Sequence, residues 1–104
     1  MQWNNEKNKQ LTKAILSLKN QTEVRKFLRD LMTETEINEF ANRLEVAKML
    51  SAKIPYTIIE EKTGLSSTTV ARVSKWLNGK EGGYRNIINK LHHSNPIQIR
   101  RGLS

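Results

Sequence analysis

Apolar residues recur every three or four positions along most of the chain, which is the period of an α-helix rather than of a β-strand. The first stripe consists of Leu11, Ala14, Ile15 and Leu18. Comparable stripes, separated by glycine, proline and capping residues, predict helices over about 10–19, 20–30, 33–53, 55–62, 66–77 and 84–92. We therefore expect an all-α fold of about six helices.

The longest predicted helix has clear signals at both ends. Thr33 and Glu36 have the spacing of a capping box, in which a threonine and a glutamate satisfy each other's backbone N–H groups. Pro55 disfavours helical geometry at Ile54, so this helix should end near Ala52 or Lys53. Its stripe is broad enough to be the spine of the core, and it consists of Ile37, Phe40, Ala41, Leu44, Ala47 and Leu50, with Met49 adjacent.

The segment over about residues 56–78 has the pattern of a helix-turn-helix. A short helix with Ile58 and Ile59 turned inward is followed by Gly64 as a left-handed turn residue and by Ser66 as an N-cap. The inner face consists of Ile59, Leu65, Val70 and Val73. The candidate DNA-contacting residues are Ser66, Ser67, Thr68, Thr69, Ala71, Arg72 and Lys75. Any two packed helices joined by a glycine turn would give a similar pattern, so that alternative stays open.

The roles within this outward face follow from side-chain chemistry. Small hydroxyl and methyl groups let a helix lie deep in the major groove, and an arginine can make bidentate contacts to guanine. We expect base readout from Ser67, Thr68, Ala71 and Arg72, and a phosphate contact from Lys75.

The charge of the chain supports a polyanionic partner. Lys and Arg number 18 against 10 Asp and Glu, which gives a net charge of +8. Residues 1–52 hold 9 basic and 7 acidic side chains, whereas residues 53–104 hold 9 basic and 3 acidic ones, so the excess lies with the helix-turn-helix. A basic surface that is merely solvated is the alternative.

Several classes of protein are disfavoured by what the sequence lacks. It has no cysteine, no apolar run of the ~18 residues that a membrane span needs, and no common catalytic or nucleotide-binding motif. Its two histidines, His92 and His93, are adjacent at the end of a predicted helix. We expect a cytoplasmic protein that is not an enzyme and has no metal, cofactor or membrane partner. One helical domain over residues 1–94 and a flexible basic tail over residues 95–104 are predicted.

The order and spacing of several segments resemble the tryptophan repressor superfamily, and in particular its YerC/YecD branch. These segments run from Ala14 to Asn20, from Leu31 to Thr33, from Arg43 to Leu50, through Gly64, and from Thr69 to Ser74. The resemblance covers roughly residues 11–92. It implies an intertwined homodimer that acts as a sequence-specific transcriptional regulator, a repressor, on roughly palindromic double-stranded DNA with half-sites about 34–36 Å apart or a multiple of that.

The dimer that the resemblance implies would have a shared core. That core would contain Leu11, Ile15, Leu18, Phe27, Leu28, Phe40 and Leu44. An ordinary monomeric core is the alternative for these residues. A helical protein-interaction module and a non-specific DNA-binding protein are the alternatives for the function.

The resemblance also implies a possible effector pocket. The ligand-contacting threonines and arginines of the family match Thr33, Arg43, Thr69 and Arg72. Val73 and Trp76 stand where the family has a glycine and a serine, and both add bulk, so tryptophan is not carried over as a cofactor and the effector is unknown. Trp76 is hypothesised to place its own indole where the ligand would lie, or else it simply packs. Arg43 and Arg72 are expected to pair with Glu45, Glu60 or Glu61 unless, in the case of Arg72, the side chain faces DNA.

Overall fold

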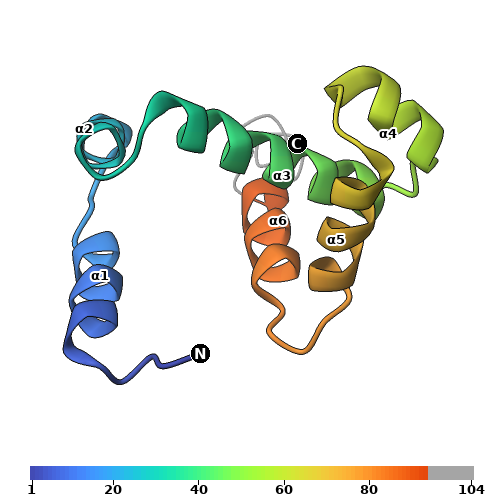
Figure 1. Ribbon diagram of the computed structural model, residues 1–104. Helices are drawn as coiled ribbons and strands as arrows, with labels where there is room; N and C mark the ends of the chain where they lie inside the picture. The colour runs from blue at the N-terminus through green and yellow to red at the C-terminus, as the bar shows by residue number, and fades with distance from the viewer. Residues whose placement is uncertain (94–104) are drawn as a thin grey trace, which may run out of the picture. The chain divides into compact units, whose positions relative to one another are not determined.

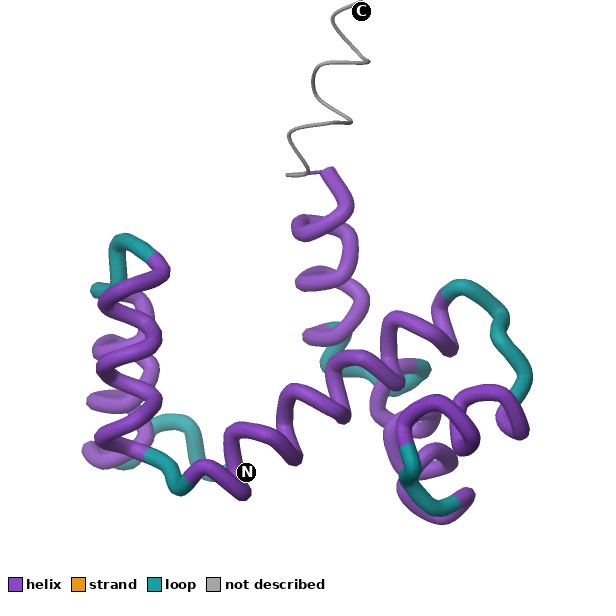
Figure 2. The backbone as a smooth tube through the Cα atoms, turned by 90° about the horizontal axis from the view of Figure 1, so that it is seen from above, coloured by secondary structure: helices purple, strands orange, loops and turns teal. Residues whose placement is uncertain are grey.

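The computed structural model describes residues 1–93, and within them it contains six α-helices and no β-strand (Figures 1 and 2). The helices are α1 (Glu6–Leu16), α2 (Gln21–Leu31), α3 (Glu34–Ser51), α4 (Tyr56–Thr63), α5 (Ser67–Leu77) and α6 (Gly83–His93). The prediction of an all-α fold is confirmed. The predicted tail over residues 95–104 lies outside the described residues.

Short side chains define where three of the helices begin. The Asn20 side chain caps α2 by accepting a hydrogen bond from the backbone N–H of Glu23 at 2.9 Å. Thr33 and Glu36 form the predicted capping box of α3: the Thr33 N–H donates to the Glu36 carboxylate at 2.9 Å, and the Glu36 N–H donates to the Thr33 hydroxyl at 3.1 Å. The Ser66 hydroxyl caps α5 by accepting from the Thr69 N–H at 3.2 Å.

The first helix does not span the predicted residues. It begins at Glu6 rather than Gln10, because the Asn5 side chain accepts a hydrogen bond from the Asn8 N–H at 2.8 Å and so provides an earlier cap. It ends at Leu16 rather than Lys19, since the Ser17 hydroxyl donates to the carbonyl of Ala14 at 2.7 Å.

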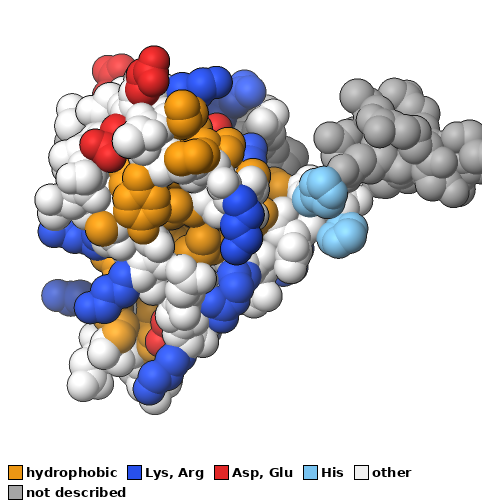
Figure 3. Space-filling view, turned by 90° about the vertical axis from the view of Figure 1, so that its right-hand side faces the viewer, with side chains coloured by type: hydrophobic (Ala, Val, Ile, Leu, Met, Phe, Trp, Pro, Cys, Tyr) orange, Lys and Arg blue, Asp and Glu red, His pale blue; other side chains and the backbone are white. Residues whose placement is uncertain are grey.

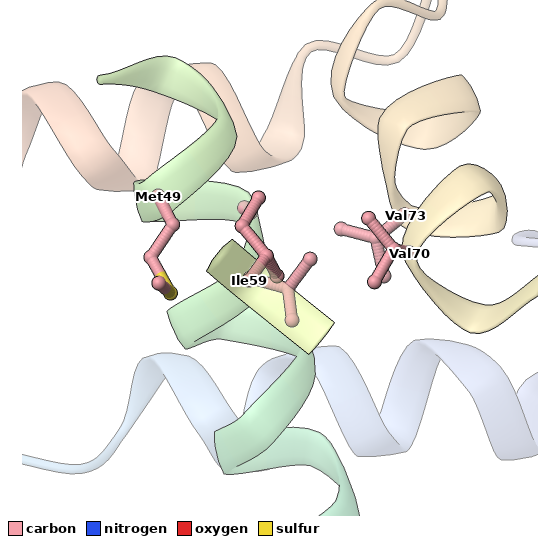
Figure 4. Close-up of a cluster of buried hydrophobic side chains, with 6 residues drawn as sticks. Met49, Ile59, Val70 and Val73 are labelled. Carbon is pink, nitrogen blue, oxygen red and sulfur yellow. The ribbon is translucent and has the colours of Figure 1, made fainter. Parts of the chain in front are cut away.

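The chain divides into two compact units, Met1–Ile37 and Asn38–Ser104. The second unit contains the core, in which side chains from α3, α4 and α5 point toward one another (Figure 4). The buried residues are Val46, Ala47 and Met49 of α3, Ile59 of α4, and Val70, Val73 and Leu77 of α5. Leu50, Ile54, Leu65, Tyr84 and Ile88 pack against this core and are partly buried.

Two predictions about the core are wrong in part. Of the predicted spine of α3, only Ala47 and Met49 are buried, while Phe40 is 40% exposed; Val46, which the prediction left out, is completely buried. The packed elements α4 and α5 meet the C-terminal half of α3, so the buried stripe is shorter and rotated toward Val46. Ile58 is 38% exposed, because adjacent helical residues point about 100° apart and Ile59 is the one that faces the core.

The first unit has a different character. Within this described unit, neither α1 nor α2 contains a buried residue. Leu11, Ile15 and Leu31 are exposed, although α2 has a strongly amphipathic sequence. Within this unit, therefore, both helices present an apolar stripe that is at least partly accessible.

Candidate nucleic-acid interface

The connection between α4 and α5 is a tight turn with a defined hydrogen-bond pattern. Gly64 adopts a left-handed conformation with φ 73°, and its N–H donates to the carbonyl of Glu60 at 2.8 Å. The Thr63 hydroxyl donates to the Ile59 carbonyl at 2.7 Å and accepts from the Leu65 N–H at 3.3 Å. This turn lets Ile59 of α4 and the inner face of α5 reach the same core, as the sequence predicts for a helix-turn-helix.

Helix α5 has two faces of opposite character. Val70, Val73 and Leu77 are buried on the inner face. The predicted DNA-contacting residues lie away from the core: Ser66, Ser67, Thr68, Ala71, Arg72 and Lys75 are exposed, and Thr69 is half-buried. The structure thus brings all seven residues to the outward side and the N-terminal end of one helix.

The electrostatics of this face suit an anion. The first turn of α5 contains no acidic residue, and the free N–H groups at a helix N-terminus carry partial positive charge. Arg72 and Lys75 add two cationic side chains further along the helix. Figure 3, which views the molecule from the side on which α4 and α5 are drawn in Figure 1, shows Lys and Arg side chains bordering the hydrophobic surface, with Asp and Glu side chains mainly at its upper edge. A phosphate backbone is a chemically suitable partner for such a surface.

Two of the six predicted effector-pocket residues touch each other. The guanidinium carbon of Arg43 lies 5.4 Å from the centre of the Trp76 ring and 5.2 Å from the centre of the Phe40 ring. Its Nη2 atom forms a 2.9 Å ion pair with Glu39. The expected partner of Arg43 was Glu45, Glu60 or Glu61, and the structure corrects this to Glu39, which lies one turn earlier on α3. Glu45 instead lies 4.0 Å from Lys48.

Three of the other four predicted pocket residues have structural roles. Thr33 caps α3, the Thr69 hydroxyl lies 3.2 Å from that of Ser66, and Val73 is completely buried in the core. Arg72 is exposed on the outward face of α5. An effector pocket made of these residues together with Arg43 and Trp76 stays a prediction.

Arg43 and Trp76 do line an open pocket of about 960 Å³. Its apolar wall includes Leu44, Tyr84 and Ile87. Burial raises the pKa of the Tyr84 hydroxyl, and the charge of Arg43 opposes that shift. The contacts of Arg43 with Glu39 and Phe40, and the wall formed by α6, were not predicted from the sequence. The i,i+4 spacing of Glu39 and Arg43 was a signal that could have identified the ion pair.

The sequence profile of the family described as Trp repressor protein matches residues 6–92. The chain belongs to the Trp repressor family. It is 42% identical over 82 residues to the uncharacterized protein YerC of Bacillus subtilis (strain 168), which covers 79% of each protein. These similarities confirm the resemblance to a YerC-type member of the family.

Solved structures of the Trp repressor family agree with this fold. A TrpR-like protein from Eubacterium eligens superposes with a TM-score of 0.81 at 41% identity, covering 86% of this chain and 93% of that one. A structure from Staphylococcus aureus gives a TM-score of 0.81 at 34% identity, covering 88% of this chain and 95% of the other. Because the family consists of non-enzymatic DNA-binding regulators, the chain is a DNA-binding regulator and not an enzyme.

Sites of two other kinds are absent from the described residues. Among residues 1–93, no group of three or more His, Asp or Glu side chains is placed to hold a metal ion. None of the helices in this part of the chain is long and apolar enough to cross a membrane.

Proposed function

We propose that the chain is a sequence-specific transcriptional repressor that acts as a homodimer and reads double-stranded DNA with the outward face of α5. The observation that carries this proposal is the division of α5 into a buried inner face and an exposed face of small polar, methyl and cationic side chains. The inner face fixes the helix to α3 and α4, and the outer face is free to enter a major groove.

The outward side chains divide into two groups by their reach and chemistry. Ser67, Thr68, Ala71 and Arg72 are proposed to contact base edges, because hydroxyl, methyl and guanidinium groups each recognise a different feature of the major groove. Lys75 is proposed to contact a phosphate. Ser66 and Thr69, which are engaged in the cap at the helix start, are proposed to lie beside the phosphate backbone.

The homodimer is supported by the apolar stripes of the first unit. Leu11 and Ile15 of α1 and Leu31 of α2 are exposed, and isolated helices of this length are only marginally stable in water. A second copy that covers these stripes would stabilise both helices. It would also supply a second α5, which allows the two helices to enter successive major grooves of a palindromic site.

The first test is a selection of bound duplexes from a pool of genomic fragments at two salt concentrations. The proposal predicts recovery of a roughly palindromic site that is retained at the higher salt. Diffuse recovery that is lost at the higher salt would favour a non-specific DNA-binding protein, because each neutralised phosphate contributes about −0.9 to the log–log salt slope. Recovery of no DNA at either concentration would favour a protein-interaction module.

A matched pair of double variants tests whether α5 is the reading element. Thr68→Ala with Arg72→Ala removes one polar and one basic side chain from the outward face of α5. Asn86→Ala with Lys90→Ala removes the same kinds of group from exposed positions of α6. The first variant should fail to recover the site, and the second should recover it. Equal recovery by both variants would contradict the assignment of α5.

A further inference from the structure

Helix α5 is joined to α3 by a contact that lies outside the buried core. The guanidinium carbon of Arg43 lies 5.2 Å from the ring centre of Phe40, on its own helix, and 5.4 Å from the ring centre of Trp76, near the C-terminal end of α5. The Arg43 side chain is 27% exposed, so the contact is partly shielded from water. This contact therefore connects the two helices through a cation and an aromatic ring rather than through aliphatic packing.

The surroundings of Arg43 hold it in the position that this contact needs. Glu39 binds its Nη2 atom at 2.9 Å, and the centre of the Phe40 ring lies 5.2 Å from its guanidinium carbon. A guanidinium held in this way has already lost much of its rotational freedom. Tryptophan offers the strongest π-face for a cation. The contact between Trp76 and Arg43 therefore costs little additional side-chain entropy, because Arg43 is already held in place.

Because Trp76 lies near one end of α5, its contact with Arg43 can control the tilt of the whole helix. Trp76 lies roughly 14 Å along the helix axis from Ser67, at about 1.5 Å per residue, so the two residues are near opposite ends of α5. Val70 and Val73 pack into the core between them. A tilt of about 10° about this central packing, roughly 7 Å from Ser67, would move Ser67 by roughly 1.2 Å, which is enough to lose a hydrogen bond to a base edge.

We propose that Arg43 and Trp76 are positioning residues that fix the angle of α5 and thereby set the sequence specificity of DNA binding. The inference rests on the proposed function, in which α5 reads the DNA. Loosening the contact should reduce binding to the correct site more than binding to unrelated DNA, since the flexible Lys75 side chain reaches a phosphate at many helix angles. A merely structural role would lower the stability and leave this ratio unchanged.

The experiment measures dissociation constants for the duplex recovered by the selection and for the same duplex with its bases scrambled. The matched variants are Trp76→Phe, which keeps an aromatic face, and Trp76→Leu, which keeps only apolar bulk. We expect Trp76→Leu and Arg43→Ala each to reduce the preference for the recovered duplex about fivefold to thirtyfold, whereas Trp76→Phe should stay within about threefold of the wild type. The double variant Arg43→Ala with Trp76→Leu should lose little more than either single variant.

Two results would overturn the proposal. One is that Trp76→Leu keeps the wild-type preference for the recovered duplex over the scrambled one. The other is that the double variant loses as much of this preference as the product of the losses in the two single variants. Trp3→Leu, at an exposed tryptophan of the first unit, is the control for the substitution itself. Circular dichroism of each variant separates a loss of specificity from a loss of folding. A wild-type chain with no preference for either duplex would instead contradict the proposed function.

A second measurement tests the contact without DNA. The chain has two tryptophans, so Trp76 is the single emitter in a Trp3→Phe background. Removing Arg43 in that background should shift the Trp76 emission to longer wavelength, because one face of the indole becomes open to water. Unchanged emission would show that the contact is absent, and this would overturn the proposal even if the chain binds DNA specifically.

Discussion

Helices α1 and α2 of the first unit and α5 of the second have the same length, 11 residues, and each has an apolar stripe. Helix α5 buries Val70, Val73 and Leu77, whereas α1 and α2 bury no residue. The period of a sequence thus predicts that a helix forms and which face is apolar. It does not say whether the same chain or a second copy covers that face.

The difference has an energetic consequence. The second unit places residues of α3, α4 and α5 in one core, so its helices stabilise one another. The first unit leaves Leu11 and Ile15 accessible, and its short helices gain little from burial within that unit. Substitutions in the core of the second unit should therefore lower the stability of the chain, whereas substitutions in the apolar stripes of the first unit should weaken its association.

The largest effect is expected in the core of the second unit. Ile59→Ala should lower the free energy of unfolding by about 2–5 kcal/mol, because it removes a fully buried side chain and leaves a cavity. Ile58→Ala is the matched control, since the neighbouring isoleucine is 38% exposed and should cost much less. Chemical denaturation measures both variants, and equal losses would contradict the description of α4.

The next largest effect is expected on self-association through the apolar stripe of α1. Ile15→Asp places a charge on the apolar stripe of α1 and should weaken self-association by at least about tenfold, as sedimentation equilibrium would show. Leu16→Asp introduces the same charge at a residue that is 83% exposed and lies outside the stripe, so it should leave association unchanged. Similar behaviour of the two variants would remove the support that α1 gives to the homodimer.

A smaller effect concerns the start of α3. Hydrogen bonds from the backbone N–H and the hydroxyl of Thr33 lower the pKa of the Glu36 carboxyl below its ordinary value of 4.5. A carboxyl whose pKa is lower in the folded state contributes stability above its unfolded pKa, and that stability is lost as the pH falls through the folded pKa. Glu36→Gln should therefore flatten the dependence of stability on pH below about 5, measured by denaturation across that range. An unchanged profile would contradict this role of the cap.

The local features of the fold were predictable from the sequence. Thr33 and Ser66 act as caps, and Gly64 is left-handed, because each of these roles depends on residues only a few positions away. The start of α1 was missed, since Asn5 provides a cap that precedes the apolar stripe. The burial of Val46 was missed as well, because it depends on where α4 and α5 meet α3.

The candidate site was predictable in part, as the fold was: its local features followed from the sequence, and its contacts between helices did not. The outward face of α5 follows from the helical period once Val70 and Val73 are placed inside. The contact between Arg43 and Trp76 was not predictable, because it joins two helices that are distant in the sequence and depends on their crossing angle. Similarity to the family identifies Arg43 and Trp76 as positions of interest. The contacts of Arg43 with the rings of Phe40 and Trp76 are seen only in the structure.

The measurement that tests the central claim most directly is the binding of Arg72→Ala to the recovered duplex and to its scrambled form. If Arg72 reads a guanine from the outward face of α5, the variant should lose about 1–3 kcal/mol on the recovered duplex and much less on the scrambled one. Lys75→Ala is the comparison, and it should lose similar amounts on both duplexes because it contacts a phosphate. Equal losses by Arg72→Ala on the two duplexes, or no loss on either, would contradict base reading by this face of α5.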